Sequence, residues 1–431
     1  MEFIYHTTNI KKHSNPVKIC LLQQLKQQSL FHLPIYQSKS LQIGLKNLNY
    51  TSKQGYGNFD THFYDGQDEV SPSGLLKISK SYREKSKYPD YLPTWDPTEK
   101  YGPLEFHEYH DPALRADGNF SNLFAKENVG QLKVKKITPK LGLEINGIQL
   151  TDLSDAAKDE LALLVAQKGV VVFRNQNFAD EGPDYVTEYG RHFGKLHIHQ
   201  TSGHPQNNPE LHITFRRPDA EEFARVFDDS TSSGGWHTDV SYELQPPSYT
   251  FFSVVEGPDG GGDTLFADTI EAFDRLSKPL QDFLSTLHVI HSSKEQAENS
   301  QRQGGIKRRA PVTHIHPLVR VHPVLKKKCL YVNRAFSRKI VELKRQESES
   351  LLNFLYNLVE SSHDLQLRAK WEPHSVVIWD NRRVQHSAVI DWEEPIHRHA
   401  FRITPQAERP VADLKFLNDE NYYPSSLTLD I

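Results

Sequence analysis

Short runs of β-branched and aromatic residues, separated by turns, recur from residue 169 onward. Residues 169–174 read Gly-Val-Val-Val-Phe-Arg, and residues 249–255, 375–380 and 399–404 have the same character. Runs of this length and composition predict buried strands. Helical patterns lie between them, at residues 154–167, 183–193, 269–276, 279–286 and 347–361. Many short strands with a few helices outside predict a mainly β fold, a sandwich or jelly roll.

Size and charge exclude several functions. The chain has 431 residues, enough for one large domain or two ordinary ones, and a net charge of -4. This charge gives no basic surface of the kind that binds nucleic acid. No run of 18 apolar residues is present, so we expect no membrane span. The two cysteines, Cys20 and Cys329, cannot form a disulfide framework, which favours a reducing, cytoplasmic location.

The N-terminal segment differs from the rest of the chain. Glu2 is its only acidic residue before Asp60, and Lys, Gln, Ser and Asn dominate. A mitochondrial transit peptide is Arg-rich, whereas this segment has no Arg, so we expect a poorly ordered extension rather than a targeting signal. The predicted organisation is an extension (1–58), a Pro/Tyr-rich arm packed on the core (59–130), a main domain (131–410) and a C-terminal tail (411–431).

A His-x-Asp pair, His237 and Asp239, follows two glycines and a tryptophan. On an extended strand both side chains would leave the same face. An imidazole and a carboxylate can occupy neighbouring positions on a metal, and one more histidine would complete the 2-His-1-carboxylate triad of Fe(II) sites. With 22 histidines in the chain, about one such pair is expected by chance. Alone, the pair favours a surface strand.

Two further polar segments could contain functional residues. His197 and His199 form a His-x-His pair, followed by His204 and His212. The cluster lacks a carboxylate in a recognised zinc pattern, so we expect at most one of its histidines at a site. Residues 296–313 are rich in Gln, Arg, Gly and Lys and are predicted to be a mobile loop with solvated charges.

Five motifs in order resemble one enzyme family. They are Gly-Gly-Trp-His237-Thr-Asp239-Val, Gly-Gly-Asp-Thr264, Leu-Tyr-Val-Asn333-Arg334-Ala-Phe336, Trp379-Asp-Asn381-Arg382 with His386, and Arg398-x-x-x-Arg402. Together they resemble the taurine dioxygenase family of Fe(II)- and 2-oxoglutarate-dependent oxygenases, from about Ile137 to about Pro405. The arm and the Leu-Gln-Pro-Pro after Tyr242 resemble its fungal sulfonate dioxygenase branch. The resemblance implies a double-stranded β-helix (jelly roll) with flanking helices.

The resemblance also implies the residues of the catalytic centre. His237, Asp239 and His386 match the iron ligands. Arg398, with the hydroxyl of Thr264, matches the group that binds the far carboxylate of 2-oxoglutarate. O₂ is the further co-substrate, and ascorbate is expected to stimulate the reaction.

The substrate residues follow in the same way. His199 and Arg402 match the pair that grips a sulfonate, and Tyr242 and Phe336 match aromatic positions lining the pocket. Two positions depart from the taurine enzymes, since Ser202 replaces a tyrosine and Ser233 an asparagine. Smaller residues there should enlarge the pocket, which favours a broad alkanesulfonate range that includes taurine.

The implied reaction hydroxylates the carbon next to the sulfonate, releasing sulfite and an aldehyde together with succinate and CO₂, and would supply sulfur to the cell. The same chemistry on a sulfate ester, an aryloxyacetate or xanthine is an alternative. A zinc hydrolase using the His-x-His pair, or a silent jelly roll used for binding, would be alternatives of other classes. By resemblance the partner is a small sulfonate, and the chain is a candidate homodimer or homotetramer with residues 79–130 at the interface.

Overall fold

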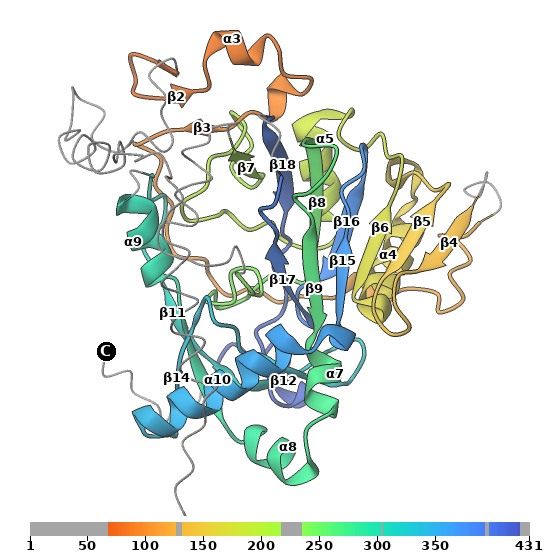
Figure 1. Ribbon diagram of the computed structural model, residues 1–431, viewed down its shortest axis with the longest axis vertical. Helices are drawn as coiled ribbons and strands as arrows, with labels where there is room; N and C mark the ends of the chain where they lie inside the picture. Colours follow the sequence, from red (N-terminus) through yellow and green to blue (C-terminus); the bar gives the residue numbers. More distant parts are fainter. Residues whose placement is uncertain (1–67, 126–131, 217–234, 303–304, 393–395, 423–431) are drawn as a thin grey trace, which may run out of the picture. The chain divides into compact units, whose positions relative to one another are not determined.

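The computed structural model describes residues 68–125, 132–216, 235–302, 305–392 and 396–422. The extension predicted at 1–58 lies outside these ranges. The largest sheet has seven strands in the order β4-β5-β6-β16-β8-β18-β7 (Figure 1). Their bounds are β4 (Lys133–Lys136), β5 (Leu143–Asn146), β6 (Val170–Phe173), β16 (Val376–Asp380), β8 (Tyr249–Glu256), β18 (Arg398–Ile403) and β7 (His212–Arg216). The pairs are antiparallel except β5 with β6.

A second sheet of three strands, in the order β15-β9-β17, faces the first. Its strands are β15 (Gln366–Ala369), β9 (Thr264–Asp268) and β17 (Val384–Ala388). One apolar cluster joins the two sheets, with Val172, Val377 and Trp379 from the large sheet against Phe266 and Leu367 from the small one. Successive side chains along a strand point to opposite faces, so every second side chain points away from this shared core.

Helices α4 (Asp155–Lys168) and α5 (Gly182–Arg191) cover the other face of the large sheet (Figure 1). Ser154 caps α4 by accepting a hydrogen bond from the Ala157 amide, and Pro183 lies in the first turn of α5. A large cluster of buried residues lies between these helices and strands β6, β8, β16 and β18. Both helices were predicted from the sequence, to within two residues at each end.

The third layer consists of helices and short strands around a separate apolar cluster. Its elements are α7 (Thr269–Asp274), α8 (Lys278–Leu284), β10 (His288–Ser292), β11 (Thr313–Pro317), β12 (Val319–Val321), β13 (Lys328–Leu330), β14 (Ser337–Ile340) and α10 (Arg345–Ser361). Strand β10 lies between β11 and β14, and β12 pairs with β13. Short 3₁₀ helices are η1 (Pro89–Tyr91), η2 (Pro112–Leu114), η4 (Leu150–Asp152), η5 (His363–Leu365) and η6 (Leu414–Phe416).

The prediction of a mobile, solvated loop at residues 296–313 is wrong in two respects. Its first part belongs to helix α9 (Lys294–Arg302), whose only apolar residue, Ala297, gives no periodic pattern to detect. Two of its charged side chains are not solvated, because Arg308 and Arg309 are 0% and 2% exposed. The Arg309 guanidinium pairs with the buried carboxylate of Glu243. A buried partner 66 residues away leaves no local signal in the sequence.

The arm packs along the large sheet. It contains β1 (Glu69–Val70), β2 (Leu76–Lys77), α3 (Lys80–Arg83) and β3 (Thr94–Trp95), and its three strands form one small sheet. Tyr91 stacks on Phe401 of β18 with ring centroids 4.9 Å apart. Asp111 accepts a hydrogen bond from the Tyr249 hydroxyl at 2.9 Å and pairs with the buried guanidinium of Arg382. The arm therefore contributes both an aromatic ring and a counterion to the core.

No helix in the part of the chain that the structure describes has both the length and the apolar character to cross a membrane.

Candidate active site

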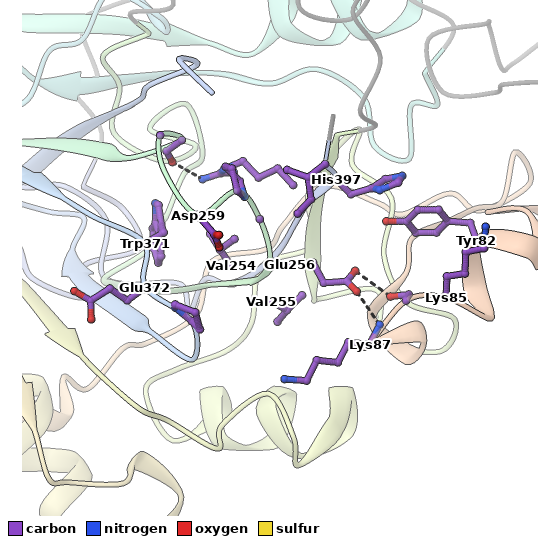
Figure 2. A pocket seen from close by; sticks show the side chains of 18 residues that line it. Tyr82, Lys85, Lys87, Val254, Val255, Glu256, Asp259, Trp371, Glu372 and His397 are labelled. Carbon is purple, nitrogen blue, oxygen red and sulfur yellow. Dashed lines mark hydrogen bonds between the residues drawn. The ribbon is translucent and has the colours of Figure 1, made fainter. Parts of the chain in front are cut away.

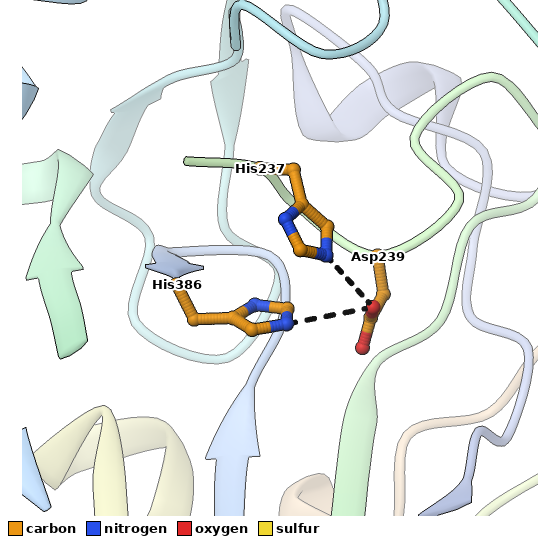
Figure 3. A group of neighbouring side chains, drawn as sticks. All are labelled: His237, Asp239 and His386. Atoms are coloured by element: carbon orange, nitrogen blue, oxygen red, sulfur yellow. Dashed lines mark ion pairs between the residues drawn. The ribbon is translucent and has the colours of Figure 1, made fainter. Parts of the chain in front are cut away.

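Two histidines and one carboxylate, His237, His386 and Asp239, point toward one another (Figure 3). The Asp239 oxygen Oδ1 lies 3.6 Å from Nε2 of His237 and 3.7 Å from Nε2 of His386. His386 lies on β17, while His237 joins that strand through an isolated antiparallel bridge. Among the described residues, these three side chains form a group that could hold a metal ion.

Asp239 reaches the group from a turn, which corrects the extended strand predicted for the pair. The chain leaves the bridge at His237 and turns at once, with Val240 at φ +40°. Asn381 holds the turn by accepting from the Asp239 amide at 2.9 Å and donating to the Asp239 carbonyl at 3.1 Å. The Thr250 hydroxyl donates to Oδ2 of the carboxylate at 3.2 Å. The carboxylate is therefore oriented at both its backbone and its side chain.

The hydrogen bonds of His237 show that this group fits a cation. Its Nδ1 lies 2.6 Å from the Gly235 carbonyl, which can only accept, so Nδ1 carries the proton. Its Nε2 then presents a lone pair toward the Asp239 carboxylate. Nδ1 of His386 is buried without a hydrogen-bond partner. Two imidazole nitrogens and a carboxylate oxygen at these distances form a donor set that a metal ion satisfies.

Charge and burial set the protonation of these ligands. Burial opposes the charged form of Asp239, but the Arg402 guanidinium and the two histidines hold its pKa well below the usual range. Burial is the largest cause that lowers the pKa of His386, to about 3. A charged carboxylate and a neutral imidazole are the forms that bind metal.

Arg402 lies beside the group on the inner face of β18. Its guanidinium Nη1 pairs with Oδ1 of Asp239. Its Nη2 contacts Nδ1 of His212, which lies directly opposite on β7 in the strand register. The expected sulfonate-binding arginine thus lies next to the candidate metal site.

His199 does not touch the metal group directly. Its Nδ1 accepts from the backbone amides of Thr201 and Ser202 and from the Ser202 hydroxyl, at 3.3, 3.2 and 2.8 Å. Its ring packs on His212 with centroids 4.4 Å apart. Of the histidines in the 197–212 segment, His212 borders the pocket beside the metal group, and His199 packs behind it. Ser233, the other departure from the taurine enzymes, lies outside the described residues.

Arg398 is the second arginine on the inner face of β18, and it is buried. Its Nη2 donates to the Gly262 carbonyl at 3.2 Å, and its guanidinium lies 5.7 Å from the Phe252 ring centroid. Burial and the nearby charge of Arg216 lower its pKa to about 10, against the opposing effect of Asp263. It also lines a pocket of about 610 Å³ that opens between the arm and the large sheet (Figure 2).

Thr264 lies at the start of β9, on the same side of the small sheet as His386. Its hydroxyl accepts a hydrogen bond from the indole nitrogen of Trp371 at 3.2 Å. Trp371 and Gly262 both belong to the pocket lined by Arg398. Arg398 therefore lines this pocket directly, and Thr264 is linked to it through Trp371.

A second pocket, of about 620 Å³, adjoins the metal group. Phe336 borders it together with His237, and their ring centroids are 6.1 Å apart. Tyr242 is fully buried behind Phe336 in an edge-to-face contact at 4.9 Å, and its hydroxyl donates to Gln296 of α9 at 2.8 Å. Of the two expected aromatic residues, Phe336 lies on the pocket and Tyr242 supports it.

The His-x-His pair does not form a zinc site in this structure. Nε2 of His197 lies 3.0 Å from the Glu243 carboxylate, which Arg309 also binds, whereas His199 caps its own turn. Burial opposes the charge of Glu243, yet His197 and Arg309 lower its pKa to about 2. The two histidines of the pair therefore have different surroundings, since His197 belongs to a buried ion cluster and His199 packs on the His212 ring.

Two residues of the site were not predicted from the sequence. Asn381 appeared only as part of a motif, without a role, and His212 only as a member of a histidine-rich segment. The alternation His-x-Thr-x-Arg at 212–216 is the one signal that marks an inward-facing strand edge. The pairing of His212 with Arg402 could be predicted only with knowledge of the strand register.

Comparison with known proteins agrees with this geometry. The model of the family described as "Taurine catabolism dioxygenase TauD, TfdA family" matches residues 133–404. The chain is 98% identical over 393 residues to an alpha-ketoglutarate-dependent sulfonate dioxygenase of Saccharomyces cerevisiae, covering 91% of this chain and 95% of the relative. Alpha-ketoglutarate is 2-oxoglutarate.

More distant relatives share the same core. The alpha-ketoglutarate-dependent dioxygenase cnsM of Penicillium expansum is 40% identical over 342 residues, covering 76% of this chain and 91% of the relative. The crystal structure of a taurine dioxygenase from Burkholderia xenovorans superposes with a TM-score of 0.53 at 27% identity, covering 65% of this chain and 93% of the other. With more than half of its length matched by the family model, the chain belongs to the TauD, TfdA family of dioxygenases.

Proposed function

We propose that this protein is a 2-oxoglutarate-dependent dioxygenase that hydroxylates the carbon bearing the sulfonate group of taurine or other alkanesulfonates. The products are sulfite and an aldehyde, with succinate and CO₂ from the co-substrate. The observation that carries the proposal is the near identity to the Saccharomyces cerevisiae sulfonate dioxygenase over almost the whole of both chains. The convergence of His237, Asp239 and His386 supports it.

These three residues are the proposed ligands of Fe(II). The bound iron, with O₂ and 2-oxoglutarate, would supply the oxidising power for a C–H bond. The chain itself presents two neutral imidazoles and one ionised carboxylate from a bridge and a turn, and leaves the remaining positions open.

Arg398 and Thr264 are the proposed binding residues for the far carboxylate of 2-oxoglutarate. A guanidinium is planar and can donate two parallel hydrogen bonds to a carboxylate. Arg398 has one donor engaged with the Gly262 carbonyl and lies buried, where an anion gains most from a charged donor.

Arg402 and His199 are the proposed sulfonate-binding residues, with Phe336 and Tyr242 forming the aromatic side of the pocket. Hydroxylation gives a 1-hydroxyalkanesulfonate. Its hydroxyl then loses a proton while the C–S bond breaks, so that the carbonyl forms and the electron pair leaves with sulfur as sulfite. The pocket of about 620 Å³ beside His237 supports substrates longer than taurine.

The alternative substrates are not favoured. An arginine and a histidine can bind any small oxyanion, so a sulfate ester, an aryloxyacetate or xanthine would fit the charge of the site. The near identity to a sulfonate dioxygenase is the observation that separates the sulfonate from them.

We further propose that the two facing sheets form the double-stranded β-helix, or jelly roll, of the family. In this organisation residues 131–410 form the dioxygenase domain, residues 59–130 the arm and residues 411–431 the tail. A cytoplasmic location, sulfur acquisition as the role, stimulation by ascorbate and assembly into homodimers or homotetramers stay predictions of this proposal.

The test is a substrate panel. Protein purified without oxygen is supplied with Fe(II), 2-oxoglutarate, ascorbate and air, and sulfite and succinate are measured with taurine, longer alkanesulfonates, an alkyl sulfate, an aryloxyacetate and xanthine. We expect sulfite and succinate in equal amounts with one or more sulfonates. Succinate without sulfite from another compound would overturn the sulfonate assignment and keep the iron chemistry. No succinate with any compound would overturn the proposal.

A further inference from the structure

Four side chains, Arg402, His212, Ser202 and His199, form a hydrogen-bonded line that begins at the candidate metal ligand Asp239. The Arg402 guanidinium contacts Asp239 through Nη1 and His212 Nδ1 through Nη2. His212 Nε2 lies 2.8 Å from the Ser202 hydroxyl oxygen, which lies 2.8 Å from Nδ1 of His199. The two residues in the middle, His212 and Ser202, have no role in the function proposed above.

The direction of every hydrogen bond in this line is fixed from its His199 end. Backbone amides only donate, and two of them point at Nδ1 of His199, so this nitrogen must accept. The Ser202 hydroxyl therefore donates its single proton to His199. Toward His212 the same oxygen can then only accept, so Nε2 of His212 carries a proton.

The other end of the line requires the same direction. A guanidinium has donors and no acceptor, so Nδ1 of His212 must offer a lone pair to Arg402. Both histidines are thus neutral and protonated at Nε2. Burial and the charge of Arg402 lower the pKa of His199 and of His212 well below the usual value, in agreement with this assignment.

This arrangement leaves two defined donors for an anion. His199 has its Nε2–H, because Nδ1 is taken by its own turn. Arg402 has its orientation set by Asp239 on one side and His212 on the other, and its buried Nε has no partner among the described residues. A sulfonate only accepts hydrogen bonds at neutral pH, so a site that offers only donors matches it.

We propose that His212 and Ser202 are positioning residues that fix Arg402 and His199 as the hydrogen-bond donors for the sulfonate. This inference rests on the proposed function and deepens it. Ser202 stands where the taurine enzymes have a tyrosine, and its small hydroxyl is what links the two histidines. His212 and Ser202 also border the pocket beside His237.

The test separates binding of the sulfonate from turnover. The Fe(II) protein with 2-oxoglutarate, kept free of oxygen, is titrated with hexanesulfonate by calorimetry, and the KM values for hexanesulfonate and 2-oxoglutarate are then measured in air. Four variants are compared with wild type: His212→Leu, His212→Gln, Ser202→Ala and the double variant His212→Leu/Ser202→Ala. His204→Gln is the matched control, since this buried histidine bonds Glu99 and does not contact the line.

We expect His212→Leu to raise the Kd and KM for hexanesulfonate by roughly 10–100-fold, the loss associated with one charged hydrogen bond, with little change in the KM for 2-oxoglutarate. The amount of sulfite per succinate should fall, because a poorly held substrate lets the co-substrate react alone. Ser202→Ala should act in the same direction, and the double variant should be little worse than His212→Leu because both changes interrupt one line. Glutamine at 212 keeps an acceptor and a donor and should restore most of the affinity.

The outcomes are distinguishable from failure of the proposed function. Normal sulfite formation by wild type with an unchanged hexanesulfonate Kd in His212→Leu would overturn the inference alone. Equal effects of His204→Gln and His212→Leu, or exact additivity in the double variant, would also overturn it, since these indicate a general structural role. Wild-type protein that forms no sulfite from any sulfonate would overturn the proposed function and this inference together.

Discussion

His237 and His386 hydrogen-bond to each other through their backbones in both directions. The His237 amide donates to the His386 carbonyl at 3.0 Å, and the His386 amide donates to the His237 carbonyl at 2.9 Å. Two of the three proposed iron ligands are therefore held at a fixed separation by main chain. A change in either side chain leaves this bridge in place.

The bridge predicts that His237→Ala separates folding from metal binding. The variant should keep the far-ultraviolet circular dichroism of wild type, because the backbone pair does not use the imidazole. It should lose tight Fe(II) binding in an anaerobic titration and form no succinate above background. Iron binding at the wild-type affinity by this variant would show that His237 is not a ligand.

Asn381 should control metal affinity without touching the metal. Its side chain holds the Asp239 turn through both the amide and the carbonyl of that residue. We expect Asn381→Ala to weaken Fe(II) binding by roughly 10–100-fold, the usual effect of removing a residue that orients a ligand. The measurement is an anaerobic Fe(II) titration, with Asn353→Ala on the exposed face of α10 as the control. Equal affinities in the two variants would contradict the prediction.

Arg398 should govern the co-substrate rather than the sulfonate. Arg398→Met removes the buried guanidinium, so we expect the KM for 2-oxoglutarate to rise roughly 10–100-fold while the KM for hexanesulfonate changes little. Arg345→Met, a change at an exposed position of α10, serves as the control. A rise confined to the sulfonate KM would assign Arg398 to the substrate instead.

Acid should destabilise the fold through buried neutral histidines. Nδ1 of His322 accepts from the amides of Val324 and Leu325 at 3.2 Å, and its Nε2 donates to Asp380 at 2.9 Å. Burial is the largest cause that lowers its pKa, to about 4, against the opposing charge of Asp380. The unfolded chain therefore binds more protons between about pH 6.5 and 4, so stability falls as the pH decreases through this range.

The measurement for this pH effect is the midpoint of urea unfolding from pH 8 to pH 5. Wild type should lose stability steadily below about pH 6.5 and change little above it. His322→Asn keeps an acceptor for the two amides and removes the titrating group, so it should start less stable but show a shallower decrease. Parallel curves for the two proteins would contradict a role for His322.

The sequence predicted the elements and the three candidate ligands for different reasons. Local composition sufficed for β6, β8 and β16 and for α4, because a β-branched run or a capped periodic pattern carries its own signal. His237, Asp239 and His386 were found through motifs whose order resembles a family. Arg309 with Glu243 and His212 with Arg402 were missed, because each pair depends on where distant strands and loops meet. The turn at Asp239 was missed because a left-handed conformation at Val240 has no signature in a non-glycine residue.

The arm contacts residues in the core of the main domain. The family model begins at residue 133, yet Asp111 and Asp380 both pair with Arg382 inside the core, and Tyr91 covers Phe401 on the back of the strand that carries Arg398 and Arg402. A fragment cut at residue 133 would remove one of the carboxylates around the buried Arg382 guanidinium, which would keep its pair with Asp380, and would uncover the Phe401 ring behind both arginines. The arm therefore takes part in the packing of the core, although the family model does not include it.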